Sequence, residues 1–277
     1  MGGAMEVGGL MSTATVRTGR GSDAHRRGRG HRASVAGATA VLMVVGWQLA
    51  APRMGTAFEL PTPVSTLGAF IEMARSGELW QAARQSGLVL LVGTIPAIAL
   101  GIVMGVIIGG VRPLDLAFSP YIYAFYSTPF VALIPLFLLV FGVGFEGKVA
   151  IVFTLVWLPV LLQTVAGVRD VDPRLLEVGR SFRANGWRIL FEIRLPAAMS
   201  LIVAGVRLAV GRALVGVVVA EFDTAFSGLG AEIFRYSQRF RLSHALVPAF
   251  VLAATGIVLT ALLHRAERRL ERWRRVE

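Results

Sequence analysis

The sequence predicts an all-α integral membrane protein with six transmembrane helices. Of its 277 residues, 55% are hydrophobic and only 16% are charged, and the mean hydropathy is +0.66. A soluble core of this length would not bury so many apolar side chains. A helix needs about 20 apolar residues to cross about 30 Å of hydrocarbon. Six apolar runs are near that length: residues 34–51, 87–110, 118–142, 149–168, 197–220 and 245–264.

The distribution of basic residues predicts the orientation of these spans. If six spans alternate in direction, 19 of the 28 Lys and Arg residues fall on one side and seven on the other. The remaining two, Arg207 and Arg212, lie inside the fifth run. The positive-inside rule therefore places both termini and loop 169–196 in the cytoplasm. It also accounts for the net charge of +11 without nucleic-acid binding, because no basic face interleaved with aromatic residues occurs.

Residues 1–33 are expected to form a disordered basic cytoplasmic tail, and residues 34–277 the transmembrane domain. The tail is rich in Gly, Ser, Thr and Arg and cannot build a core. One alternative is a signal peptide with a twin-arginine pair at Arg26 and Arg27; another is a start at Met5 or Met11. An uncleaved first span is favoured because its apolar run is long and no small-x-small cleavage motif follows it directly.

The third run is expected to break in the middle of the membrane. Three prolines remove backbone donors there, and the break should fall near Pro129. Irregular backbone at membrane depth is tolerated where protein or a water-filled cavity satisfies it. Tyr126, Thr128 and Pro129 are therefore candidates for the translocation path, whereas an aromatic belt at the interface is the other reading of the tyrosines. The residues concerned are Pro120, Pro129, Pro135, Tyr121, Tyr123 and Tyr126.

Ionisable residues are scarce in the spans. Arg207 and Arg212 are expected either to snorkel to the cytoplasmic interface or to form salt bridges within the bundle. Arg212, together with Glu221 at the end of the fifth run, is a further candidate for the path. This scarcity argues against a proton-coupled or sodium-coupled transporter. A secondary transporter or channel subunit that is not coupled to ATP is kept as the alternative function.

The sequence contains no arrangement of residues typical of an enzyme or a metal site. Cysteine is absent, the four histidines are scattered, and no metalloprotease or serine-hydrolase motif occurs. Residues 142–148 fit the first part of a phosphate-binding loop, but Val149 stands where Ser or Thr must hold magnesium. We therefore expect no catalytic residue and no cofactor in this chain.

Two further patterns predict helix packing. Gly101, Gly105 and Gly109 repeat every fourth residue in the second run, and such a stripe lets another helix approach closely. Between the first and second runs, two prolines followed by periodic apolar residues predict an amphipathic helix on the outer surface.

Loop 169–196 is expected to form two short helices with charged faces. Asp172 before Pro173 is typical of a helix start, and Asn185-Gly186 is typical of a break. A second helix follows the break, and Pro196 can begin the fifth span. Such a loop offers a compact docking surface to a soluble partner.

At these residues the chain resembles the permeases of ABC importers. Their cytoplasmic loop carries E-A-A-x-x-x-G, then nine residues and I-x-L-P, and here Glu177 and Ile193-x-Leu195-Pro196 match. Val178 and Gly179 replace the two alanines, and Arg183 replaces the glycine. The segments TPFVALIPLFLLVFGVG, AGVRDVDPRLLEVGRSF and GVVVAEF are similar to the nitrate, sulfonate and taurine branch. The resemblance spans roughly residues 60–272.

The resemblance implies the type I importer fold, with its core at about residues 80–265. It also implies a second, identical permease copy, two ATPase subunits that bind ATP and Mg²⁺, and an extracytoplasmic substrate-binding protein. The location would be the bacterial inner membrane, and the solute a small anion such as a sulfonate, nitrate or taurine. A different second permease, and another solute, stay open. The implied coupling residues are Glu177, Val178, Gly179, Arg183, Gly186, Ile193, Leu195 and Pro196.

Arg183 is the main departure from the family pattern. In the family the glycine sits at the turn between the two short helices. Arginine would either clash with the ATPase or pair with an acidic residue on it. Gly186, three residues later, is expected to supply the turn instead.

Overall fold

The computed structural model describes residues 35, 37–39, 41–53, 60–224 and 226–271, the last three without their side chains. The chain divides into two units, Met1–Met54 and Gly55–Glu277. In the first unit, the described residues from 35 to 50 are helical, and a short 3-10 helix, η1 (Ala51–Arg53), follows. The predicted tail, residues 1–33, lies outside the described residues.

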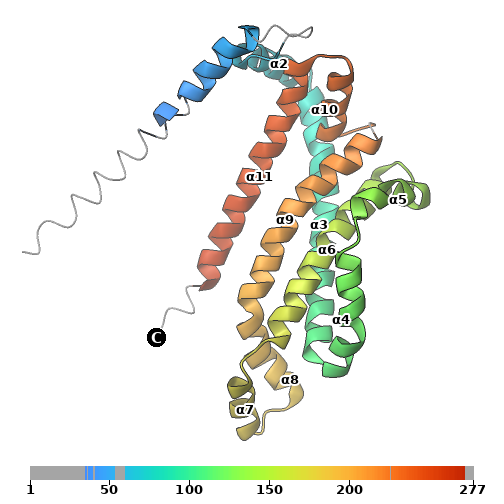
Figure 1. Ribbon diagram of the computed structural model, residues 1–277, viewed down its shortest axis with the longest axis vertical. Coiled ribbons are helices and arrows are strands. Elements are labelled where there is room, and N and C mark those ends of the chain that lie inside the picture. The colour runs from blue at the N-terminus through green and yellow to red at the C-terminus, as the bar shows by residue number, and fades with distance from the viewer. Residues whose placement is uncertain (1–34, 36, 40, 54–59, 225, 272–277) are drawn as a thin grey trace, which may run out of the picture. The chain divides into compact units, whose positions relative to one another are not determined.

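The second unit is all-helical over the residues that the structure describes (Figure 1). Its elements are α2 (Pro63–Arg75), α3 (Glu78–Gly110), α4 (Arg112–Tyr126), η2 (Phe130–Leu133), α5 (Ile134–Phe141), α6 (Phe145–Arg169), α7 (Pro173–Ser181), α8 (Gly186–Arg188), η3 (Ile189–Arg194), α9 (Leu195–Thr224), α10 (Leu229–Gln238) and α11 (Leu242–Glu271). The element η3 is a π-helix.

Four helices of the described part of the chain are long and apolar enough to cross a membrane, and one bent pair raises the number to five. The four are Glu78–Gly110, Phe145–Arg169, Gly186–Thr224 and Leu242–Arg268. They correspond to the second, fourth, fifth and sixth predicted runs and extend beyond them. The first run is only partly described and is not among these spans, so the structure supports five of the six predicted crossings.

The third predicted span is a bent pair of helices. α4 and the segment Phe130–Phe141 meet at 78°, and the break falls at residues 127–129, where the prolines predicted it. The Ser127 and Thr128 hydroxyls donate to the carbonyls of Tyr123 and Ala124 at 3.0 and 3.1 Å. The Ser127 amide also donates to the Tyr123 carbonyl at 3.0 Å, so backbone and side-chain donors together bond carbonyls at the end of α4.

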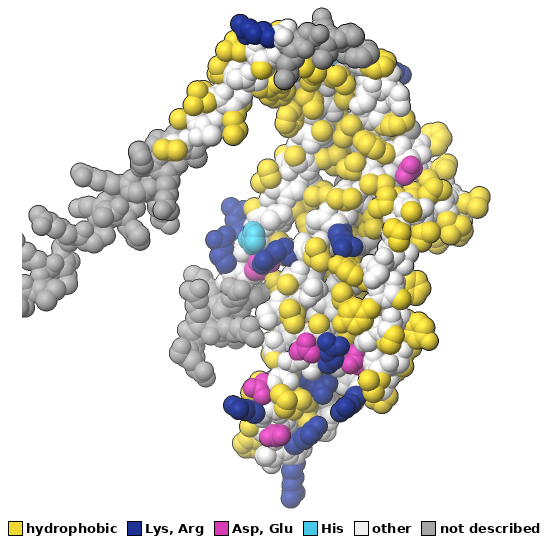
Figure 2. Space-filling model, in the orientation of Figure 1, with side chains coloured by type: hydrophobic (Ala, Val, Ile, Leu, Met, Phe, Trp, Pro, Cys, Tyr) yellow, Lys and Arg dark blue, Asp and Glu magenta, His cyan; other side chains and the backbone are white. Residues whose placement is uncertain are grey.

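The core of the second unit lies where α3, α6 and α9 pack together. Its buried side chains are mostly valine and alanine: Val89, Leu90, Ala97, Val152, Val156, Val160, Ala209, Ala213 and Val217. Small residues bring the helix backbones close, which is how membrane helices gain packing without a hydrophobic driving force from lipid. Figure 2 shows apolar side chains along the middle of the bundle and charged ones gathered at the end that carries α7 and α8.

The glycine stripe of α3 packs against α6, as its spacing predicts. A Cβ at Gly101, Gly105 or Gly109 would come within 2.8 Å of a backbone or side-chain atom of α6. At Gly105 it would lie 2.5 Å from Cβ of Thr164, and the Thr164 side chain is fully buried.

Gly105→Val is therefore expected to destabilise the bundle by about 1–3 kcal/mol, the usual penalty for overpacking a close contact. Gly87→Val in the same helix is the control, because a Cβ there meets nothing within 4 Å. Melting temperatures of the two purified variants in one detergent compare them. Equal melting temperatures would show that the α3–α6 contact is not tight.

The predicted amphipathic helix before the second span is α2. Thr62 and Ser65 form a reciprocal capping box, with hydrogen bonds of 3.1 and 2.9 Å, and Pro63 opens the helix. Ala69 and Met73 face the core, whereas Val64, Leu67, Phe70 and Ile71 are exposed. The exposed apolar face suits a helix that lies at a membrane surface.

Candidate functional site

Loop 169–196 folds into short helices at one end of the bundle (Figure 1). Asp172 caps α7 by accepting a hydrogen bond from the Arg174 amide at 2.9 Å, as its position before Pro173 predicts. Asn185 caps the second helix by accepting from the Arg188 amide at 2.8 Å. α8 then runs without a break through η3 into α9, and together they form the apolar helix Gly186–Thr224. A force applied to α8 therefore reaches the fifth span through continuous helix.

The loop exposes an unusual number of large apolar side chains for a charged surface. Phe182 is 82% exposed, Trp187 is 70% exposed and Val178 is 55% exposed. Trp187 stacks on Phe191, with ring centroids 5.8 Å apart. Glu177 and Arg183 are exposed beside them. Exposed aromatic residues surrounded by charge mark a protein-binding surface.

The two halves of the family motif meet inside the loop. Gly179 is buried, and a Cβ there would lie 2.5 Å from Cδ1 of Ile193. Small residues at this position thus let the second short helix pack on the first. Leu195 packs with the apolar cluster of Val168, Ala198 and Ile202, and Pro196 is the second residue of α9, directly after the π-helix η3 in the continuous helix.

The turn of the loop is formed by Arg183 and not by Gly186. Arg183 has φ +55°, in the left-handed region, just after α7 ends at Ser181. Helices commonly end with a residue in this conformation, usually glycine, which explains the glycine of the family pattern. Gly186 has no positive φ, lies within α8, and has open space around its Cα. The expectation that Gly186 supplies the turn was therefore wrong, because a loop that turns at 183 needs no second reversal at 186.

Arg183→Gly is expected to keep the loop structure and to stabilise it by up to about 1 kcal/mol. Glycine removes the left-handed strain of an L-residue, about 1–2 kcal/mol, but adds roughly 0.5–1 kcal/mol of unfolded-state freedom. The melting temperature of the purified Arg183→Gly variant shows which of these two effects is larger. Arg183→Val, a β-branched residue in the same conformation, is the opposite control and should melt below the wild type. A melting temperature of Arg183→Gly well below that of Arg183→Val would contradict the left-handed turn.

Of the candidate path residues, the structure brings Tyr126 and Arg212 together. Arg212 Nη2 donates to the Tyr126 hydroxyl at 2.9 Å, and its Cζ lies 5.0 Å from the ring centroid. Tyr126 ends α4 immediately before the break, and Thr128 and Pro129 form the break itself. Arg212 also lines an open hollow of about 300 Å³ with Val131, Leu155, Leu208, Gly211 and Val215.

Arg207, in contrast, forms a salt bridge within the bundle. Its guanidinium donates to both carboxylate oxygens of Glu267 on α11, at 3.1 and 2.5 Å. Of the two expected outcomes for these arginines, snorkelling or a salt bridge, Arg207 takes the second. Arg212 forms no salt bridge among the described residues, and its described partner is the Tyr126 hydroxyl.

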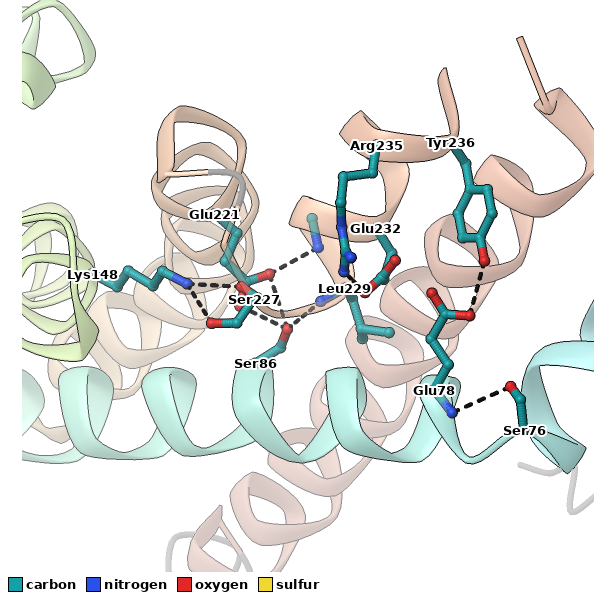
Figure 3. A network of polar contacts seen from close by, with 11 residues as sticks. Ser76, Glu78, Ser86, Lys148, Glu221, Ser227, Leu229, Glu232, Arg235 and Tyr236 are labelled. Atoms are coloured by element: carbon teal, nitrogen blue, oxygen red, sulfur yellow. Dashed lines mark hydrogen bonds and ion pairs between the residues drawn. The ribbon is translucent and has the colours of Figure 1, made fainter. Parts of the chain in front are cut away.

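Glu221 belongs to a separate, buried polar network and not to the hollow. Its side chain is fully buried and accepts hydrogen bonds from Ser86 at 2.7 and 2.9 Å and from the Gly230 amide at 2.8 Å (Figure 3). It also interacts electrostatically with buried Lys148, which donates to the Ser227 carbonyl at 2.7 Å. Every described contact of Glu221 lies within this network, and Glu221 does not line the hollow beside Arg212.

This network was missed because its members are far apart in sequence. Ser86, Lys148 and Glu221 come from α3, α6 and α9, and the Leu229 amide of α10 donates to Ser86 Oγ at 2.8 Å. One signal was present, because Ser86 and Lys148 each stand directly before an apolar run, and a polar side chain buried there needs a partner. Lys148 also ends the apparent phosphate-binding loop. Its ammonium is occupied by Ser227 and it is only 3% exposed, so it cannot hold a phosphate.

At the same end of the bundle, two contacts secure α2 and α10. Tyr236 donates to Glu78 at 2.8 Å, and burial together with this bond raises the pKa of the Tyr236 hydroxyl. Glu72 pairs with His244 at 3.1 Å, and this hydrogen bond lowers the pKa of the Glu72 carboxyl. The Tyr236 hydroxyl therefore stays protonated and keeps donating to Glu78 through neutral pH.

The fold and these sites define a helical membrane subunit with a charged loop of short helices, rich in exposed aromatic residues, at one end. The family model for the inner membrane component of binding-protein-dependent transport systems matches residues 97–276. The chain belongs to this family and is a permease subunit of an ABC importer that depends on a binding protein.

Several transport permeases are similar to this chain over most of their length. The riboflavin transport system permease protein of Chloroflexus aurantiacus is 33% identical, over 85% of this chain and 88% of the relative. The putative aliphatic sulfonates transport permease protein of Bacillus subtilis is 29% identical, over 85% of each chain. The taurine transport system permease protein of Escherichia coli is 26% identical, over 86% of this chain and 88% of the relative.

A solved structure supports the fold. The crystal structure of an amino acid ABC transporter with histidines matches with a TM-score of 0.54 and 21% identity, covering 73% of this chain and 97% of that one. The expectation of an ABC importer permease is thus confirmed, and it replaces the alternative of a secondary transporter or channel.

Proposed function

We propose that this chain is one of two identical permease subunits and that its loop 169–196 receives an ATPase subunit. The observation that carries the proposal is the exposure of Phe182, Trp187 and Val178 on a loop that continues directly into α9. Such side chains are unfavourable in water unless a partner covers them. Glu177 stands beside them as the matching acidic residue of the family motif.

The loop is tied to the bundle at its base, which suits the transmission of force. Arg194, the last residue of η3, donates to the Gly110 carbonyl at 2.8 Å. Arg169, which ends α6, lies 4.0 Å from Asp115 of α4. A movement of α7 and α8 would therefore shift α3, α4 and α9 together. The partner ATPase would bind ATP and Mg²⁺ and supply the energy, and this chain would supply the path.

We further propose that the subunit lies in the bacterial inner membrane with both termini and loop 169–196 in the cytoplasm. The excess of arginine on that side supports this orientation. An extracytoplasmic binding protein would then deliver the solute to the opposite end of the bundle, where α10 is held by the Glu221 network.

The solute that we propose is a small anion of the sulfonate, nitrate or taurine type. Sulfonate and taurine permeases among the relatives support it. A riboflavin permease and a formylaminopyrimidine permease are similar to a comparable degree. The class of solute therefore has to be decided by uptake measurements.

Co-purification tests the proposal. A tagged permease expressed with its neighbouring ATPase should retain that ATPase after detergent extraction, and a Phe182→Asp variant should lose it. Uptake into cells should stop on ATP depletion and survive loss of the proton gradient. Retention of the ATPase by Phe182→Asp would contradict the loop as the docking surface, and uptake that follows the proton gradient would contradict ATP coupling.

A further inference from the structure

We propose that Arg212, oriented by Tyr126, binds the anionic group of the solute in the hollow between α9, α6 and the broken third span. This inference rests on the proposed function as a permease and names the chemistry of its path. It does not depend on which residues of loop 169–196 contact the ATPase.

The first argument is the charge of Arg212. In the described part of the chain, no carboxylate lies within ion-pair distance of its guanidinium, whereas Arg207, on the same helix, is paired with Glu267. Guanidinium keeps its charge in any protein environment. An arginine at membrane depth without an acidic partner marks a ligand or ion pathway more often than a structural contact.

The second argument is depth. At 1.5 Å per residue, Tyr126 lies about 21 Å along α4 and Arg212 about 25 Å along α9. Both helices start at the same end of the bundle, because Arg194 before α9 bonds Gly110 before α4. The pair therefore lies within the apolar length of the spans, well away from the end of the bundle at which α4 and α9 begin.

The third argument is the space beside the guanidinium. The other residues that line the hollow are apolar or glycine, so they offer an anion no competing charge. A Cβ at Gly211 would meet nothing within 4 Å, which leaves room next to Arg212. Low-dielectric walls strengthen the field of a single positive charge. The planar fork of a guanidinium matches two oxygens of a sulfonate, nitrate or carboxylate.

Tyr126 holds this guanidinium in place by a hydrogen bond and by its ring face. Its hydroxyl takes one of the five N–H donors of Arg212, and the others stay available to a ligand. Because Tyr126 ends α4 at the break, a movement of the broken span against α9 would change the exposure of Arg212. Tyr126 is therefore the positioning residue, and Arg212 is the binding residue.

Charge-selective labelling tests the site, because the chain has no cysteine of its own. A single cysteine is placed at Val215 in the hollow, in the complete transporter with its ATPase and binding protein in nanodiscs. Its reaction rates with an anionic reagent, sulfonatoethyl methanethiosulfonate, and a cationic one, trimethylammonioethyl methanethiosulfonate, are compared. Gln81→Cys is the reference position, since it is exposed at the start of α3 between the opposite charges of Glu78 and Arg84.

We expect the anionic reagent to be favoured at Val215→Cys by about tenfold relative to the reference. Arg212→Gln should abolish the preference, Arg212→Lys should keep most of it, and Tyr126→Phe should reduce it in part. Methanesulfonate should slow the labelling in the presence of Arg212 and have no effect with Arg212→Gln. Equal preference with Arg212 and Arg212→Gln, or no labelling of Val215→Cys by either reagent, would overturn the proposal.

The outcome is separable from that of the docking proposal. Glu177→Ala should leave the labelling preference unchanged while it alters coupling. If the ATPase co-purifies and drives uptake but the preference is absent, only the anion site fails. If no ATPase associates with the permease, the proposed function itself fails.

Discussion

Glu177→Ala and Phe182→Ala are each expected to reduce ATP-driven uptake about tenfold or more while the permease still inserts and folds. Both side chains are exposed, and neither side chain supports the fold of the loop. Their loss therefore acts on the partner. Truncation of a central interface residue typically costs about 2 kcal/mol, and 1.4 kcal/mol is already a tenfold change in binding.

The measurement is uptake into proteoliposomes that contain the permease, its ATPase and its binding protein. Glu146→Ala is the matched control, because Glu146 is an exposed acidic residue at the opposite end of the bundle. Melting temperatures should not differ among the three variants. Normal uptake by both loop variants would contradict the role of the loop in coupling.

Glu221→Ala is expected to destabilise the permease by about 3–5 kcal/mol, because it leaves several buried polar groups without their partner, at about 1–3 kcal/mol for each. It leaves Ser86 Oγ and the Gly230 amide without their acceptor and Lys148 without a nearby negative charge. For a chain of this size, the melting temperature should fall by roughly 10 °C. The α10 segment should also become more accessible to protease, because the network holds its first turn.

Two variants separate the lost negative charge from the lost hydrogen bonds. Glu221→Gln keeps the volume and an acceptor for Ser86 but not the charge. Glu221→Gln combined with Lys148→Met removes the unpaired cation as well, and should recover part of the stability. A melting temperature of Glu221→Ala within 1–2 °C of the wild type, about the effect of less than 1 kcal/mol, would show that the network is not structural.

The helical bundle was largely predictable because membrane spans are recognised by length and composition alone. The break at Ser127–Pro129 followed from the prolines, and the close approach of α3 to α6 followed from the spacing of Gly101, Gly105 and Gly109. The break was predicted, but its angle of 78° was not, since the angle depends on packing against other helices. The structure supports five of the six predicted membrane spans. The first predicted run is only partly described.

Contacts between distant residues were the part that the sequence did not reveal. Tyr126 and Arg212 were each candidates, but only the fold shows that they touch across 86 positions. Glu221 was a candidate for the path because it is ionisable and closes a span. Its true partners lie on three other helices, and no local pattern could show them. Arg183 was identified as a departure from the family, but its left-handed backbone came only from the fold.

The most direct test of the account is a cross-link from loop 169–196. Phe182→Cys, in an otherwise cysteine-free chain, is labelled with benzophenone maleimide in membranes that contain the whole transporter and is then irradiated. We predict a covalent product between the permease and the ATPase subunit, absent when the label is placed at Gln81→Cys. Cross-links that join Phe182→Cys only to lipid or to the permease itself, with active transporter present, would contradict the claim that this loop receives the ATPase.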